Sequence, residues 1–272
     1  MNGFVVLKNE YITLKISLKG ASVAEVTDSD GNILLCGGAT LLFPVCGGVY
    51  KNILTIGESE CKIPGNGFVR DCEFMLLESY EDYAEFILSS DDDTIDMYPF
   101  SFNIIVAYKL LGRAFEITCR AGNFAEHKMP YSVGINTYFP VSRSVRLEAE
   151  FDRDEVMEGY MLKDGLYCGE VKRLMPQNGK ALNIEKNSQF VIKNIISDSV
   201  ALLEDSKALA QISAEGLPHF AVCNSDEYIS VGMWQGFAGS FGRKDDFLKK
   251  DDIKFADENS SDEYRFLLSF NI

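Results

Sequence analysis

Apolar and polar residues alternate along much of this chain, in short stretches rather than long ones. The alternation is clear at residues 11–17, 102–110, 115–120, 145–151 and 190–195. Because neighbouring side chains of a strand point to opposite faces, this period of two predicts half-buried β-strands. Residues that favour tight turns lie between such stretches, at Asp30-Gly31-Asn32, Leu111-Gly112-Arg113, Asp164-Gly165 and Asn178-Gly179.

Helical periodicity is missing from the sequence over any window of about a dozen residues. Many short strands with little helix between them favour an antiparallel sandwich or barrel over parallel βαβ units. The 272 residues contain no Pro-, Gly- or Ser-rich linker and no repeat of fixed period. We therefore predict an all-β protein in which residues 1–272 form one domain.

Two charged segments need a separate interpretation. Asp91-Asp92-Asp93 lacks the alternating spacing of a calcium-binding loop, so we expect a solvated turn there. Residues 244–253 alternate in charge sign, and we expect an exposed loop near the C-terminal end.

The charge balance narrows the range of partners. The chain has 41 Asp and Glu against 26 Lys and Arg, a net charge of −15, with 46% hydrophobic residues. The hydrophobic content is ordinary for a packed globular protein. The surplus of carboxylates repels phosphate backbones and anionic lipid headgroups, so we expect neither nucleic acid nor a membrane surface as a partner.

Cysteine usage bears on the compartment. Seven cysteines are dispersed without a CxxC pair, an odd set that indicates buried free thiols rather than a disulfide framework. The first residues show no signal-peptide pattern, and no stretch approaches the roughly 18 apolar residues that span a bilayer. We expect a cytoplasmic protein.

Several common chemistries lack their motifs. GxGxxG, GxxxxGK[ST], GxSxG and HExxH are all absent, and the only histidines are His127 and His219. The cysteines do not have metal-ligand spacing either, so we predict no metal and no cofactor. His127, in a polar stretch, is expected in an exposed loop.

Three blocks of sequence resemble the aldose 1-epimerase (galactose mutarotase-like) family, and in particular its LacX-like branch. The family's patterns are LFPxxGR with PxHGFxRD, then TxxxYPFxF with MPFSxGxHPxF, then xxCxEPWxG. The corresponding segments here are LFPVCG at 42–47 with IPGNGFVRD at 63–71, TIDMYPFSF at 94–102 with MPYSVGINTYF at 129–139, and YISVGMWQG at 228–236. The blocks occur in the family's order and extend over nearly the whole chain.

This resemblance implies a large antiparallel β-sandwich, the galactose mutarotase-like supersandwich, with a sugar groove on one sheet. It implies a small-molecule partner, an aldohexose or a derivative, and leaves the oligomeric state open. Mutarotation needs a base at the anomeric hydroxyl and an acid at the ring oxygen. The family uses a Glu and a His for these roles, with a second His and an Arg to hold the sugar.

This chain departs from the family at each of these positions. Asn66 and Asn136 replace the two histidines, Gly232 replaces the Glu, and Gly48 replaces the Arg. An amide forms hydrogen bonds but does not exchange a proton near neutral pH, and glycine has no side chain. The acid–base pair of the family is missing, so we predict no catalytic residue at these positions.

The remaining candidates for sugar binding are Asn66, Arg70, Asn136, His219, Gly232 and Trp234. Arg70 could bind sugar hydroxyls, or form a structural ion pair with Asp71 or Glu73. Trp234, the only tryptophan, could stack on a sugar or anchor the groove from below. His219 could act as a substitute acid or base, or be a surface or structurally bonded histidine.

Three hypotheses for the function follow from these departures. The first is an aldose 1-epimerase-like carbohydrate-binding protein that is catalytically impaired or inactive. The second is an active hexose mutarotase or isomerase that uses substitutes such as His219. The third is a non-enzymatic structural or regulatory protein, which a groove filled by bulky side chains would favour.

Overall fold

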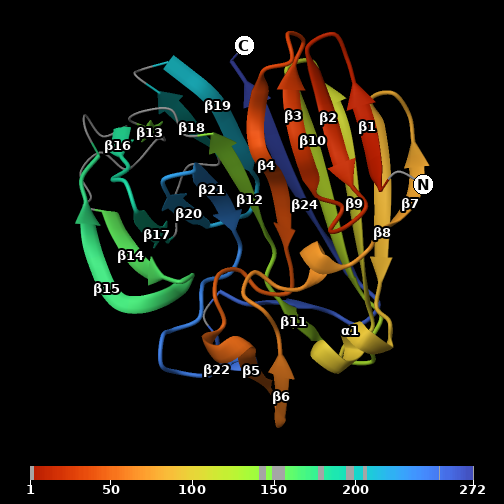
Figure 1. The fold of residues 1–272 in the computed structure, drawn as a ribbon. Helices are drawn as coiled ribbons and strands as arrows, with labels where there is room; N and C mark the ends of the chain where they lie inside the picture. Colours follow the sequence, from red (N-terminus) through yellow and green to blue (C-terminus); the bar gives the residue numbers. More distant parts are fainter. Residues whose placement is uncertain are drawn as a thin grey trace.

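Two large antiparallel β-sheets pack face to face in the computed structural model (Figure 1). The structure describes residues 3–140, 145–148, 157–176, 181–193, 199–204, 207–250 and 252–271. The predicted all-β sandwich is confirmed.

The first sheet carries the candidate site and has ten strands within the described residues. In spatial order they are β1 (Phe4–Lys8), β2 (Ile12–Ser17), β3 (Val23–Asp28), β4 (Ile33–Leu42), β12 (Gly134–Pro140), β21 (Tyr228–Trp234), β20 (His219–Asn224), β17 (Ser188–Ile192), β14 (Met157–Lys163) and β15 (Leu166–Leu174).

The second sheet has nine strands within the same ranges. In spatial order they are β16 (Ala181–Asn183), β13 (Val145–Glu148), β18 (Ser199–Glu204), β19 (Lys207–Ala214), β24 (Ser261–Phe270), β10 (Ala114–Asn123), β9 (Phe102–Leu111), β8 (Tyr83–Ser89) and β7 (Met75–Ser79).

Short elements lie outside the two large sheets, and those that Figure 1 labels lie at one end of the sandwich. They are β11 (Met129–Tyr131) paired with β23 (Lys254–Ala256), β22 (Asp245–Asp246) beside β5 (Ile53–Ile56) and β6 (Ser59–Lys62), the helix α1 (Asp92–Met97), and the 3₁₀ turns η1 (Tyr50–Asn52), η2 (Val69–Asp71) and η3 (Phe247–Lys249).

Alternation along the strands produces the core. In β9 and β10 every second side chain is buried, and these side chains join one large apolar cluster between the two sheets. In β21, Ile229, Val231 and Met233 belong to this cluster, whereas Trp234 belongs to a smaller one. The even-numbered side chains of β21 therefore lie on the opposite face of the first sheet, where the smaller cluster packs.

The predicted strands at 11–17, 102–110 and 115–120 correspond to β2, β9 and β10. Those at 145–151 and 190–195 correspond in part to β13 and β17, and the remainder of each, except Lys193, lies outside the described residues. Asp164-Gly165 is the two-residue loop of the β14–β15 hairpin, with Lys163 paired to Leu166. The predicted turn at Asn178-Gly179 also lies outside the described residues.

The expectation at Asp91-Asp92-Asp93 was right about exposure and wrong about the turn, because all three residues are exposed but Asp92 and Asp93 begin the helix α1. Asp91 is the N-cap of α1, where its carboxylate accepts a 2.9 Å hydrogen bond from the backbone N–H of Thr94. The Thr94 hydroxyl in turn accepts a 2.7 Å bond from the backbone N–H of Asp91. This reciprocal capping starts a helix too short to leave a periodic signal.

The expectation of an exposed loop at residues 244–253 was right only in part, because Lys244, Leu248, Lys249 and Asp252 are exposed but other residues of the segment are buried. Phe247 is fully buried in the large core, and Asp245 is 9% exposed. Asp245 can be buried because it has cationic neighbours, which are described below.

The seven cysteines are free thiols. Cys46, Cys61 and Cys119 are buried, but Cys168 is exposed, so burial holds for only part of the set. The described part of the chain contains no helix long and apolar enough to cross a bilayer.

Candidate functional site

Strand register aligns the predicted site residues on one face of the first sheet. Asn136 of β12 pairs with Gly232 of β21, and Gly232 pairs with Ala221 of β20. Trp234 pairs with His219 in the adjacent row. Since residues two apart on a strand share a face, Asn136, Gly232, Trp234 and His219 lie on the face opposite the large core.

A buried hydrogen bond joins two of these residues. Nε1 of Trp234 donates to Oδ1 of Asn136 at 2.8 Å. A Cβ added to Gly232 would lie 2.2 Å from that Oδ1 and 2.7 Å from that Nε1. The bond thus occupies the space into which a side chain at position 232 would extend.

Asn66 forms hydrogen bonds with the loop that contains Gly47, which also borders the site. Its φ of +64° lies in the left-handed region that asparagine tolerates better than most residues. Its Oδ1 accepts from the backbone N–H of Gly47 at 2.9 Å, and its own backbone N–H donates to the Gly47 carbonyl at 2.7 Å. Asn66 therefore fixes the loop that follows β4.

Asn66, Asn136 and Trp234 line one small cavity, which we name the central groove. Its lining residues are Gly47, Asn66, Asn136, Leu162, Gly165, Gln189, Ala221, Val222, Cys223, Ser230 and Trp234. Its volume is about 50 Å³. That is space for a few water molecules, well below the roughly 300–1,000 Å³ of ordinary ligand pockets.

The β14–β15 turn closes the central groove at Gly48. The Gly48 N–H donates to the Gly165 carbonyl at 2.7 Å, and the Gly239 N–H donates to the Gly48 carbonyl at 2.8 Å. A Cβ on Gly48 would lie 2.8 Å from the carbonyl carbon and oxygen of Gly165. Position 48, where the resemblance implies an Arg in the family, is thus in backbone contact with this turn.

The central groove has few side chains that could act as an acid or a base. Among its described lining residues, Cys223 is the titratable one, and burial raises the pKa of its thiol. A thiol with a raised pKa stays protonated near neutral pH. Neither a carboxylate nor an imidazole is among these lining residues.

Arg70 lies outside the central groove lining. Its Nε is 3.5 Å from Oδ2 of Asp71, which corresponds to the structural ion pair. The positive charge of Arg70 also acts on the hydroxyl group of Tyr138. Burial raises the pKa of Tyr138, and a hydrogen bond with Asn136 and the charge of Arg70 oppose that rise.

His219 is fully buried and also lies outside the central groove lining. Its Nε2 is 3.0 Å from Oδ2 of Asp252, and Nζ of Lys193 is 3.7 Å from the same oxygen. Burial lowers the pKa of His219, Asp252 opposes the shift and Lys193 adds to it. The imidazole is held against the carboxylate of Asp252 and does not itself line the central groove.

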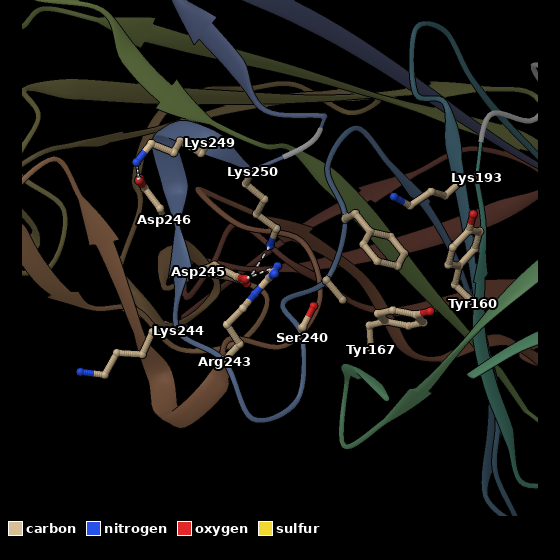
Figure 2. A pocket seen from close by; sticks show the side chains of 12 residues that line it. Tyr160, Tyr167, Lys193, Ser240, Arg243, Lys244, Asp245, Asp246, Lys249 and Lys250 are labelled. Carbon is tan, nitrogen blue, oxygen red and sulfur yellow. Dashed lines mark ion pairs between the residues drawn. The ribbon is translucent and has the colours of Figure 1, made fainter. Parts of the chain in front are cut away.

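A second and larger cavity lies on the same face of the sheet and is lined in part by the small cluster that contains Trp234 and Phe237. We name it the lateral cavity; its volume is about 570 Å³. Figure 2 shows its lining residues, which are Tyr160, Tyr167, Lys193, Phe237, Ala238, Ser240, Arg243, Lys244, Asp245, Asp246, Lys249 and Lys250.

Three aromatic rings form one wall of the lateral cavity. The Tyr160 ring centroid is 5.7 Å from that of Tyr167 and 5.6 Å from that of Phe237. Nζ of Lys193 lies 4.0 Å from the Phe237 centroid and 5.2 Å from the Tyr160 centroid. These contacts place a cation against the aromatic wall.

Two cations share one carboxylate on the opposite wall. Nζ of Lys250 is 3.8 Å from Oδ2 of Asp245, and Nη2 of Arg243 is 3.5 Å from Oδ1 of the same carboxylate (Figure 2). Lys250 is 11% exposed. Burial lowers the pKa of Lys250, and Asp245 opposes that shift.

The residues of the lateral cavity were not predicted as a site. The alternating charges of 244–253 were visible in the sequence, but they resemble those of a solvated loop. The aromatic wall comes from β14, β15 and the segment after β21, which only the fold brings together.

The fold and the central groove together define a class, an antiparallel sandwich of the galactose mutarotase type. The chain belongs to the aldose 1-epimerase family, whose sequence model matches residues 4–228. The resemblance of the chain to this family is thereby confirmed.

Relatives with known sequences or structures agree with this assignment. Protein LacX (plasmid) of Lactococcus lactis subsp. lactis is 24% identical over 265 residues, covering 86% of this chain and 88% of the relative. A galactose mutarotase-like protein from Lactobacillus casei superposes with a TM-score of 0.87 at 15% identity, covering 99% of this chain and 100% of the other. A galactose mutarotase related enzyme from Lactobacillus acidophilus has a TM-score of 0.84 at 17% identity, covering 99% and 97%.

Proposed function

We propose that this protein binds a sugar and does not catalyse mutarotation at the position where its family does. The observation that carries the proposal is the Trp234–Asn136 hydrogen bond over Gly232. A carboxylate base at position 232 and this hydrogen bond are mutually exclusive, because both need the same space. The family's base is therefore replaced by an interaction between two side chains.

The neutral lining of the central groove supports the loss of catalysis. Asn66 and Asn136 are engaged by Gly47 and Trp234, and amides do not transfer protons near neutral pH. Each acid or base group contributes about 10²–10⁴ to the rate in such reactions. Losing both is expected to reduce catalysis to the spontaneous rate.

The lateral cavity is the place that we propose for the sugar ring. Its 570 Å³ falls within the range of ligand pockets, and its three aromatic rings suit the apolar C–H face of a pyranose. Asn66 and Asn136 would meet a sugar only if the turn at Gly165 moved away from Gly48. We further expect the protein to act in the cytoplasm, in keeping with its free thiols.

A second candidate function is a structural or regulatory role without a sugar ligand. One observation favours it, the 50 Å³ volume of the central groove. Trp234 and the β14–β15 turn fill space that a sugar would need there.

Proton NMR on one sample distinguishes these functions. Equilibrated glucose or galactose is mixed with the protein, saturation transfer to sugar protons reports binding, and exchange between the two anomeric signals reports mutarotation. We expect saturation transfer without added anomeric exchange. Exchange faster than in buffer would contradict the loss of catalysis, and no transfer with any neutral or anionic sugar would support the second candidate.

A further inference from the structure

The lateral cavity differs in charge from the rest of the molecule. The chain has a net charge of −15, yet five of the twelve residues that line this cavity are cationic and two are acidic. Lys244 and Lys249 are occupied at the rim by Glu60 and Asp246. The other three cations are Lys193, which pairs with Asp252, and Arg243 and Lys250.

Lys250 and Arg243 leave a positive charge that the cavity itself does not balance. They share the single carboxylate of Asp245, at 3.8 and 3.5 Å, which is longer than the roughly 2.7–2.9 Å of a charge-assisted hydrogen bond. Asp245 is 9% exposed and Lys250 is 11% exposed, so water compensates the charge of Lys250 little, whereas Arg243 is 74% exposed and stands at the open side of the cavity. A bound anion would supply the missing charge and accept hydrogen bonds from both cations.

An aromatic wall faces this pair across the cavity (Figure 2). Tyr167 and Tyr160 lie on the side of the cavity away from Lys250 and Arg243, and Phe237 packs within 5.9 Å of Tyr167 between ring centroids. A ring-shaped ligand on this wall would have its far end toward Lys250 and Arg243. The cavity thus combines a stacking surface with an anion-binding end.

We propose that the lateral cavity binds a monosaccharide bearing an anionic group, with its ring on the wall of Tyr160, Tyr167 and Phe237 and its anion between Lys250 and Arg243. This inference rests on the proposed sugar binding and specifies its substrate class. Phosphate and carboxylate share the required chemistry, because each offers negatively charged oxygens to two cations. The test includes both.

Isothermal titration calorimetry of the full chain tests the proposal. The ligands are glucose 6-phosphate, galactose 6-phosphate, glucuronate, glucose, galactose and inorganic phosphate. We expect at least one anionic sugar to bind about tenfold or more tightly than its neutral counterpart and than inorganic phosphate. Comparison of the two sugar phosphates with glucuronate then shows whether the cavity prefers a phosphate or a carboxylate.

Variants separate a specific charge contact from a general charge effect. Lys250→Met is expected to weaken binding of the anionic sugar about tenfold or more, whereas Lys250→Arg keeps the charge and most of the affinity. Lys128→Met removes one exposed charge elsewhere and should leave affinity unchanged. Circular dichroism checks folding, and Tyr167→Ala, which leaves the cations in place, provides a second test through lost stacking.

Failure of the inference and failure of the proposed function give different results. Equal binding of neutral and anionic sugars would overturn the inference and leave sugar binding intact. Inorganic phosphate binding as tightly as the sugar phosphates, or an unchanged affinity in folded Lys250→Met and Tyr167→Ala, would also overturn it. Absence of binding by every sugar would overturn both.

Discussion

Trp234 donates its indole N–H to the side-chain oxygen of Asn136, and this bond lies directly over the Cα of Gly232. The three residues belong to adjacent strands, β12 and β21, and Asn136 faces Gly232 in register. Each therefore constrains the others. Asparagine supplies the acceptor, tryptophan the donor, and glycine the space in which they meet.

Gly232→Ala is predicted to destabilise the protein. The new Cβ would lie 2.2 Å from Oδ1 of Asn136, so the hydrogen bond must lengthen or the strands must shift. Overpacking of this kind costs about 1–3 kcal/mol. Urea unfolding measures the change in the free energy of unfolding.

Two comparisons make the Gly232 prediction specific. Gly3→Ala adds the same methyl where nothing lies within 4 Å, and it should change the free energy of unfolding by about 0.5 kcal/mol or less. In an Asn136→Ala background, Gly232→Ala should cost less than in the wild type, since the contact at Oδ1 is gone. Equal costs in both backgrounds would contradict the account.

Gly48→Arg, which introduces the residue that the resemblance implies for this position, is predicted to destabilise the protein rather than to improve sugar binding. Its Cβ would lie 2.8 Å from the backbone of Gly165, which cannot move aside as a flexible side-chain end could, and 2.9 Å from Cγ of Leu166. We expect a loss of at least about 1–3 kcal/mol in urea unfolding. Gly3→Arg is the matched control, and a Gly48→Arg variant as stable as that control would show that the turn is readily displaced.

Much of the fold could be predicted from the sequence, because alternation with period two is local information. The central groove could also be anticipated, because the resemblance placed Asn66, Asn136, Gly232 and Trp234 in the family's positions. Their contacts could not, since the bond between Trp234 and Asn136 joins residues 98 apart in the chain. Only the register of β12 and β21 brings them together.

The lateral cavity was harder to foresee for a different reason. Asp245 and Lys250 have the composition of a solvated loop, and only their pairing in space permits burial. The start of α1 at Asp91 was missed because a helix of six residues depends on its cap rather than on a periodic face.

Because of His219, the free energy of unfolding is predicted to fall in mild acid. Burial lowers its pKa from an ordinary value of 6.5, with Asp252 opposing and Lys193 adding to the shift. As the pH falls below about 6.5, the unfolded chain takes up a proton that the folded chain does not. Stability is thus fully present above that pH and is lost as the pH falls toward the folded-state pKa, by up to about 1.4 kcal/mol per pH unit.

Urea unfolding of His219→Gln between about pH 7.5 and 5 checks this prediction. The variant should lose less stability on acidification than the wild type, whatever its stability at pH 7.5. His127, which is exposed on a bend, gives the control His127→Gln, whose acid dependence should follow the wild type. Parallel curves for wild type and His219→Gln would contradict the assignment.

Lys250 is predicted to make binding of an anionic sugar sensitive to alkaline pH. Burial lowers its pKa from 10.5, Asp245 and Cys46 oppose the shift, and Lys193 and Arg243 add to it. The amine therefore loses its charge at a lower pH than an ordinary lysine, and affinity should fall as the pH is raised from neutral. Calorimetry should show that the affinity of Lys250→Arg falls less as the pH rises, because a guanidinium keeps its charge. An equal fall in affinity for the wild type and Lys250→Arg would show that a group other than Lys250 is titrating.

The most direct measurement of the central claim is the rate of mutarotation. Freshly dissolved α-glucose or α-galactose is followed by polarimetry with and without the protein, because the rotation changes as the anomers interconvert. The account predicts the same rate in both samples, in the wild type and in folded Asn136→Ala. A turnover in the ordinary enzymatic range of about 1–10³ s⁻¹ that Asn136→Ala abolishes would contradict it.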